Sequence, residues 1–220
     1  MEEIEKDTYS RLIESAGALF AQKGFKETTI REICEHADAN IASVNYYFRD
    51  KKKLFLQVLH FVIEKSEEKY PVDRLYDEFV TPKDKLHEFV HDIVMRRFSP
   101  ELPRWFGKLI NRETIMEISE VRDIMMQEHS KVCIFFKPFI AQELKVSKDS
   151  MIVKLCETSI LGNIRFLTGP IFFEHHPLFS KEISEKLLAK LIDYITDFSL
   201  ASITGIRDRL QQEGNEKYEI

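Results

Sequence analysis

The residues whose types and spacing best suit recognition chemistry lie between Thr29 and Lys51. The amide of Asn45 can bond to both edge groups of an adenine, and Ala42 or Ile41 can contact a thymine methyl. Tyr46 and Tyr47 hold hydroxyls on rigid rings that suit phosphates. These side chains together favour contact with a nucleic acid duplex. We expect phosphate contacts from Thr29, Tyr46, Tyr47 and Lys51, and positions near base edges for Arg31, Ser43 and Asn45.

Each of these residues also has a purely structural interpretation. Tyr46 and Tyr47 could be packing aromatics, and Asn45 could be an ordinary surface residue. The run of three lysines at 51–53 suits the solvated first turn of a helix, so only Lys51 is expected to make a contact. The net charge of −5 argues weakly against nucleic acid. Residues 23–53 are nevertheless the one positive stretch, and a small local excess is enough for phosphate contact.

A second motif, His87-Glu88-Phe89-Val90-His91, matches the H-E-x-x-H pattern of zinc peptidases. It falls on a predicted helix, so both imidazoles share one face. A peptidase also needs a third ligand and a cleft with an edge strand, and no strand-forming segment lies nearby. No catalytic Ser/His/Asp or Cys pattern and no glycine-rich phosphate loop occurs. We therefore expect no enzyme, no resident metal and no cofactor, while a regulatory metal or ligand site at His87 or His91 stays an alternative.

Composition predicts an all-α protein. The 220 residues include 7 Gly and 7 Pro, few for a chain that needs frequent turns, and 44% are hydrophobic. Three distant cysteines, Cys34, Cys133 and Cys156, indicate neither a disulfide framework nor a zinc knuckle. No apolar run approaches the ~20 residues that span a bilayer, and the N-terminus is acidic. We expect a soluble, cytoplasmic protein without membrane contact.

The first 70 residues predict a chain of short helices. A helix over 7–23 ends at Gly24 in a left-handed conformation, and Thr29 to Glu32 reads as a capping box for a two-turn helix. Asp38-Ala39-Asn40 predicts a tight turn in which Asn40 caps a helix over 41–47. A longer helix opens at Lys51. Three helices with a three-residue turn between the second and third predict a helix-turn-helix.

The rest of the chain predicts one larger helical domain. Helices are expected over 82–98, 104–117, 121–144 with a kink near Pro138, 149–167 and 180–211, with a loop over 169–179. We expect a DNA-binding domain over 7–67 with its motif at 29–48, a helical domain over 68–212, and a frayed tail over 213–220.

The N-terminal domain expected over 7–67, called the head below, carries more than a helix-turn-helix pattern. The stretch Gly24-Phe25-(x3)-Thr29-Ile30-Arg31-Glu32-Ile33-Cys34-(x10)-Asn45-Tyr46-Tyr47-Phe48-(x2)-Lys51-(x2)-Leu54-Phe55 resembles the N-terminal domain of the TetR family of transcriptional regulators. The chain departs from that pattern at Asp38, where the family commonly has Gly, and at Asn40, where it has a hydroxyl. Residues 41–48 further resemble a branch that includes the CecR-type regulators.

The resemblance implies a homodimer that binds two half-sites of a palindromic operator. Proteins of this family typically dimerise through their last two helices. Small residues among the aliphatics there would permit close helix approach, although the same stripes could be the domain's own core. The residues that we expect at the dimer interface are Leu155, Ser159, Ile160, Leu188, Ile192, Ile195, Ser199 and Ser202.

The resemblance also implies a cavity among the middle helices. An effector that binds there would favour a state in which the two DNA-binding domains of the dimer lie farther apart than DNA binding requires. This segment is rich in aromatics and methionines that suit an apolar or aromatic compound, and equally suit a core. The expected effector-binding residues are His91, Trp105, Phe106, Met126, Phe136, Phe139, Asn163 and Phe166. The sequence thus predicts a repressor released by a small molecule; a regulator that responds to a metal or a protein partner is the alternative.

Overall fold

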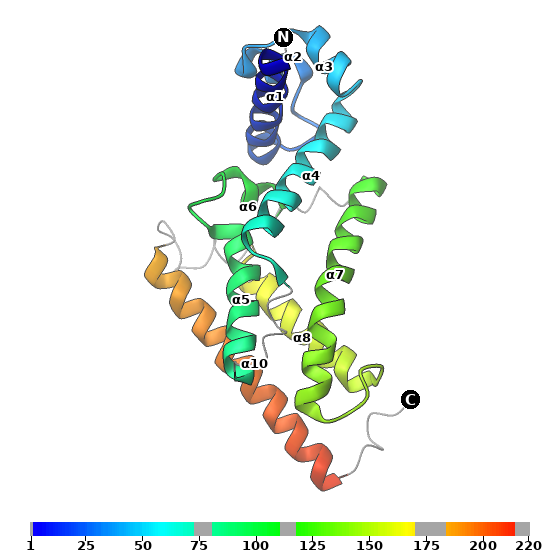
Figure 1. The fold of residues 1–220 in the computed structure, drawn as a ribbon, viewed down its shortest axis with the longest axis vertical. Helices are drawn as coiled ribbons and strands as arrows, with labels where there is room; N and C mark the ends of the chain where they lie inside the picture. Colours follow the sequence, from blue (N-terminus) through cyan, green and yellow to red (C-terminus); the bar gives the residue numbers. More distant parts are fainter. Residues whose placement is uncertain (1, 73–80, 111–117, 170–183, 214–220) are drawn as a thin grey trace. The chain divides into compact units, whose positions relative to one another are not determined.

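A computed structural model describes residues 2–72, 81–110, 118–169 and 184–213 (Figure 1). Over these ranges the regular structure is helical and no strand occurs, which confirms the all-α class. The helices in chain order are α1 (Glu2–Lys23), α2 (Ile30–Ala37), α3 (Ile41–Tyr47), α4 (Lys51–Lys69), α5 (Pro82–Phe98), α6 (Trp105–Ile110), α7 (Ser119–Leu144), α8 (Met151–Leu167) and α10 (Glu185–Glu213).

The chain divides into two compact units. The first comprises Met1–Lys69 together with Arg96–Met125, and the second comprises Tyr70–Met95 together with Met126–Ile220. Residues 96–125 therefore pack with the N-terminal helices, although they follow α5 in the chain. The functional division into residues 7–67 and 68–212 stays a prediction.

The first unit is built on α1, which contacts α2, α3, α4 and α6. Its core holds Leu12, Phe20, Ile33 and Phe55, each at most 1% exposed, and the rings of Phe20 and Phe55 meet edge to face at 4.8 Å. Burial of large aromatic and aliphatic side chains of this kind supplies most of the stability of a small helical unit. α2 and α3 are too short to be stable as isolated helices, so they depend on this core.

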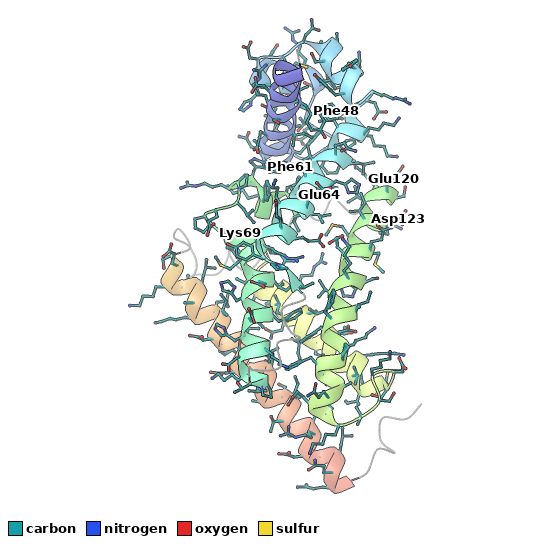
Figure 2. The ribbon with its side chains drawn as sticks, viewed as in Figure 1. Phe48, Phe61, Glu64, Lys69, Glu120 and Asp123 are labelled. Carbon is teal, nitrogen blue, oxygen red and sulfur yellow. The ribbon has the colours of Figure 1, made fainter. Side chains whose placement is uncertain are left out.

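Two side chains labelled in Figure 2 show how α4 is held within the first unit. Phe61 on α4 meets Phe106 of α6 with ring centroids 6.0 Å apart, and Glu120 at the start of α7 accepts from Lys52 at 2.5 Å. The Lys52–Glu120 pair is about half exposed, so it contributes little to stability.

The second unit contains an aromatic core and polar ties between α5 and α10. The rings of Phe89 and Phe136 stack at 4.2 Å, and Phe136 is fully buried. Lys83 pairs with Asp197 at 2.7 Å, and His87 lies 3.2 Å from Asp193. These contacts fix α5 to α10 inside this unit.

Helix boundaries differ from the sequence-based expectations at a few ends. α1 begins at Glu2 instead of Asp7, and α8 begins at Met151 instead of Asp149. α7 continues through Pro138 as one helix. α6 is described to Ile110, whereas most of the loop expected over 169–179, the start of the helix expected over 180–211 and the tail over 214–220 lie outside the described residues. For the described residues, no helix combines the length and apolar character that spanning a membrane requires.

Candidate DNA-binding surface

The start of α2 is fixed by a capping box, as the sequence predicts. The backbone N–H of Glu32 donates to the Thr29 hydroxyl at 3.2 Å, and the backbone N–H of Thr29 donates to Glu32 Oε2 at 2.9 Å. Thr29 has extended backbone angles, as an N-cap requires. The Thr29 hydroxyl also donates to Glu32 Oε2 at 3.1 Å. A phosphate contact by Thr29 would therefore share a hydroxyl that already serves the cap.

We expect the Glu32 carboxyl to titrate with a pKa of about 2, because the Lys23 ammonium at 2.6 Å and then the Thr29 cap hold it ionised. A carboxyl whose pKa is lowered by folding stabilises the fold above its ordinary value, here 4.5, and this stabilisation is lost as the pH falls toward 2. An NMR titration of the Glu32 carboxyl and of the α2 amides measures both effects. Lys23→Met should raise the pKa and move the loss to higher pH; an ordinary Glu32 pKa in the unmodified chain would contradict the expectation.

The turn between α2 and α3 has the chemistry that its sequence predicts. Asp38 ends α2 in the left-handed region at φ 48°, a conformation that Asp tolerates better than most residues. Asn40 caps α3 by accepting the backbone N–H of Ala42 at 2.7 Å. The departures from the family pattern at these two positions thus preserve the turn.

Arg11 is a positioning residue that the sequence analysis missed. Its Nε donates to the carbonyl of Ala37 at 3.1 Å, and its Nη2 lies 3.4 Å from the carbonyl of Asp38. These carbonyls lie at the C-terminus of α2, where a cation is favoured by the helix dipole. Asp7, one turn earlier in α1, orients the guanidinium at 2.5 Å. The sequence signal available was only an i, i+4 charge pair, which does not reveal the distant carbonyls.

α3 presents one buried and one exposed face. Val44 is fully buried and Phe48, which follows the helix, is 2% exposed. Tyr46 is 73% exposed, and its ring meets that of Tyr47 at 4.9 Å. Ile41, Ala42 and Asn45 share the exposed side, whereas Ser43 is half-buried. Of the three residues expected near base edges, Asn45 lies on this exposed side, and Arg31 is exposed on α2.

Tyr47 lies against the aromatic side chains that hold α3 on the head. Its ring contacts Tyr9 of α1 edge to face at 5.8 Å, and Tyr9 in turn stacks on Phe48 at 5.1 Å. The Tyr9 hydroxyl lies 3.4 Å from Gln57 on α4. Phe48 is labelled in Figure 2. Tyr47 thus helps to pack α3, and its expected phosphate contact stays a prediction.

Arg31 has the freedom that base contact requires. Its side chain is 82% exposed, and it pairs at 2.8 Å with Glu35, one turn later in α2, whose side chain is 63% exposed. Together these two residues line an open hollow beside the turn, with Cys34, Asp38, Ala39 and Ile41. The pair is a weak surface interaction that a competing acceptor could replace.

Lys51, for which a phosphate contact stays a prediction, has acceptors for its ammonium close by. Its ammonium lies 2.9 Å from the carbonyl oxygens of Phe25 and Thr28, 3.4 Å from that of Lys26, and 4.6 Å from the centre of the Phe25 ring. The three donors of an ammonium therefore have acceptors within the head. Lys51 closes the loop between α1 and α2, and a phosphate contact would have to share these donors.

Lys51→Ala is expected to lower the free energy of unfolding by about 1–3 kcal/mol, because partly buried carbonyls would lose their donor. Lys53→Ala is the matched control, since Lys53 is exposed and its loss should change stability by less than about 0.5 kcal/mol. Denaturant unfolding measures both. Equal stability of the two variants would show that the loop does not need this ammonium.

The residues expected at an effector site fall in both units, and their grouping into one site stays a prediction. Trp105 and Phe106 belong to the first unit, where the Trp105 indole donates to Glu14 on α1 at 3.1 Å and Phe106 is 1% exposed. In the second unit Phe136 and Phe139 pack as core, with rings stacked 6.1 Å apart. Helical periodicity predicts which side of a helix is apolar, but it does not identify what packs against that side.

The other four candidates for that site belong to the second unit. Met126 and Phe166 are 56% and 61% exposed among the described residues. His91 lies 3.0 Å from Asp92. Asn163 Oδ1 is buried with no hydrogen-bond partner among the described residues.

The two histidines of the H-E-x-x-H motif bind different carboxylates. His87 faces Asp193 of α10, whereas His91 faces its neighbour Asp92. Within the described ranges no three His, Cys, Asp or Glu side chains lie close enough to hold a metal ion. The motif therefore gains no third ligand from the part of the chain that the structure describes.

The helices expected to form a dimer show both a core face and an exposed face. Ile160, Leu188, Ile192, Ile195 and Ser199 are at most 5% exposed within one chain, so they fill the core of the second unit. Leu155 is 48% exposed, and Ser159 is also exposed. Phe166, Tyr194 and Phe198 are exposed as well, at 49% or more, and the sequence predicted none of the three at the interface. Spacing alone does not show which of two apolar stripes on a helix is buried in its own unit and which is exposed.

Three comparisons bear on this architecture. Residues 12–58 match the profile of bacterial regulatory proteins of the tetR family. A curated relative from Bacillus subtilis (strain 168), described as a probable HTH-type transcriptional regulator, YttP, is 30% identical over 122 residues. The match covers 56% of this chain and 58% of YttP, so the chain spans little more than half of that relative's length.

The fold is similar to solved structures over most of the chain. A TetR-like transcriptional regulator from Rhodococcus sp. RHA1 matches with a TM-score of 0.66 and 13% identity, over 88% of this chain and 96% of that one. The transcriptional regulator FadR from Bacillus subtilis, in complex with stearoyl-CoA, matches with a TM-score of 0.63 and 14% identity, over 88% and 98%. At these identities the likeness concerns the fold alone.

Proposed function

We propose that the chain is a regulator of the TetR family, a cytoplasmic repressor that binds a palindromic DNA operator as a homodimer and is released by a small apolar or aromatic effector. The match of residues 12–58 to the tetR profile and the similarity to YttP support this proposal. The observation that carries the proposal is the solvent face of α3. Slim or planar side chains cover it, namely Ile41, Ala42, Asn45 and Tyr46, and its opposite face is anchored in the core. A helix with these properties can enter the major groove without losing its support. The finer CecR-type resemblance stays a prediction.

The groups around α3 support contact with the DNA backbone. Tyr46 projects a hydroxyl into solvent, and the backbone N–H groups at the starts of α2 and α3 favour anions. Asn45 and Ser43 are the expected base-edge contacts, and Arg31 can reach outward from α2. Phosphate contacts of this kind position the helix, whereas the base contacts specify the sequence.

A dimer is supported by the exposed apolar stripe on α8 and α10. Tyr194 and Phe198 stack at 6.1 Å and are both about half exposed, and Leu155 and Phe166 are exposed on α8. Gly162 and Gly205 lie on the same two helices with open space where a Cβ would stand. Large apolar side chains beside such gaps suit a second copy that packs closely.

The apolar effector is supported by the composition of the second unit and by the fold likeness to FadR, whose structure contains stearoyl-CoA. Stearoyl-CoA is therefore the first compound to test. Asn163 is the one predicted effector-binding residue whose buried acceptor lacks a partner among the described residues. Response to a metal or a protein partner stays the alternative, with His87 and His91 as its residues.

Selection from a pool of random duplex DNA tests the proposal. We expect enrichment of a palindrome whose half-sites lie about one helical turn, or a multiple of it, apart. Adding stearoyl-CoA to the selected complex should lower the fraction bound. If no palindrome is enriched, the DNA-binding proposal is wrong; if one is enriched but stearoyl-CoA has no effect, only that effector is excluded.

A further inference from the structure

A single aromatic side chain fills a gap in the central helix of the first unit. A Cβ added to Gly17 of α1 would lie 2.2 Å from Cη2 and 2.3 Å from Cζ3 of Trp105. The same indole donates its N–H to Glu14 Oε2 at 3.1 Å, one turn earlier in α1. We call Glu14 and Gly17 the Trp105 seat. Only Gly at position 17 lets the ring lie this close to the backbone of α1.

α6 is held on its other sides by equally close contacts. A Cβ on Gly107 would lie 2.2 Å from the carbonyl oxygen of Arg97, so α6 packs directly on the backbone at the end of α5. Phe106 is 1% exposed, and its ring meets Phe61 of α4 (Figure 2). Trp105 and Phe106 also touch edge to face at 4.6 Å. α6 therefore has little room to shift without disturbing its contact with α1.

The helix that carries the seat also positions the recognition helix. Arg11 of α1 binds the carbonyls at the end of α2, and Ser15 lies 3.0 Å from His36 of α2. Tyr9 stacks on Phe48, which anchors α3. Arg11 and Gly17 are six residues apart, about 9 Å along the axis of a helix. The stretch of α1 from Tyr9 to Gly17 thus contacts both the helix-turn-helix and α6.

We propose that Trp105 is a positioning residue that couples α6 to the orientation of α3 through α1, and that it does not contact the effector. The inference rests on the proposed DNA-binding function. A shift of α6 moves the ring out of its seat or carries α1 with it, and the turn held by Arg11 moves accordingly. Because coupling between two sites is reciprocal, DNA bound at α3 must change the environment of Trp105.

Trp105 is the only tryptophan of the chain, so its fluorescence reports on the seat directly. Gly17→Ala should shift the emission to longer wavelength, because the added methyl displaces the ring into water. Ala favours a helix more than Gly does, so any loss of stability in this variant comes from the clash. Unchanged emission would show that the ring does not need the gap and would overturn the proposal.

The coupling itself is measured with the selected duplex. On saturation with DNA, the unmodified protein should change its Trp105 emission and slow amide exchange in residues 104–110, although α6 is not expected to touch DNA. Gly17→Ala should change the operator Kd by about five-fold or more, within the usual range of coupling. If that variant does not fold, Trp105→Phe provides the same comparison of affinity. Lys108→Ala, on the exposed side of α6, is the matched control and should leave the Kd unchanged.

The outcomes separate the inference from the proposed function. If no duplex is selected, the DNA-binding function fails and the coupling fails with it. If a duplex binds but Trp105 emission, exchange in α6 and the Kd of the seat variants do not change, only the coupling is overturned.

Discussion

Phe48→Ala is expected to lower the free energy of unfolding by about 3–5 kcal/mol and to abolish operator binding. Phe48 is 2% exposed and stacks on Tyr9 at 5.1 Å, so its loss leaves a cavity under the recognition helix. α3 has seven residues and cannot persist without this packing. Denaturant unfolding and a DNA-binding titration measure the two effects.

Tyr46→Ala is the matched control for that variant. Its ring is 73% exposed, so stability should change by less than about 0.5 kcal/mol, while affinity for DNA falls for all sequences because a phosphate contact is lost. If both variants lose stability equally, the assignment of a core face and a DNA face on α3 is wrong.

Phe198→Glu is expected to convert the proposed dimer to monomer and to weaken operator binding by about 10³ or more. The side chain is 49% exposed on α10, and a charge there cannot be buried in an apolar interface without a large cost. A monomer reads one half-site, so its affinity approaches the non-specific level. Sedimentation and DNA titration measure the two effects.

Ile134→Glu provides the comparison for the dimer variant. Ile134 is 64% exposed on α7, outside the stripe on α8 and α10, so the same change of charge should leave the dimer and the DNA affinity intact. A Phe198→Glu protein that stays dimeric would contradict the proposed interface.

The local signals of the head could be predicted from the sequence because each depends on neighbours within a few residues. The capping box at Thr29, the Asn40 cap and the left-handed Gly24, at φ 89°, are examples. Each needs one hydroxyl, amide or missing Cβ at a fixed offset, and the sequence displays that offset. The burial of Val44 and Phe48 follows in the same way from helical spacing.

The contacts between distant segments could not be predicted. The carbonyls around Lys51 come from residues 23 to 26 positions earlier, and the indole of Trp105 lies on α1, 91 residues from Glu14 in the chain. Aromatic enrichment predicts an effector site that includes Trp105 and Phe136, but enrichment does not distinguish such a site from a core, because aromatic rings fill both equally well. Which of two apolar faces on α8 is exposed depends on the partner helix, which spacing does not identify.

The account depends most on α3 reading base edges, and duplex selection with Asn45→Ala tests this most directly. Selections with the unmodified chain and with the variant should enrich the same palindrome except at one symmetry-related pair of positions. There the unmodified chain should prefer adenine, and the variant should have relaxed that preference. An identical enriched sequence for both proteins would contradict the placement of Asn45 in the groove.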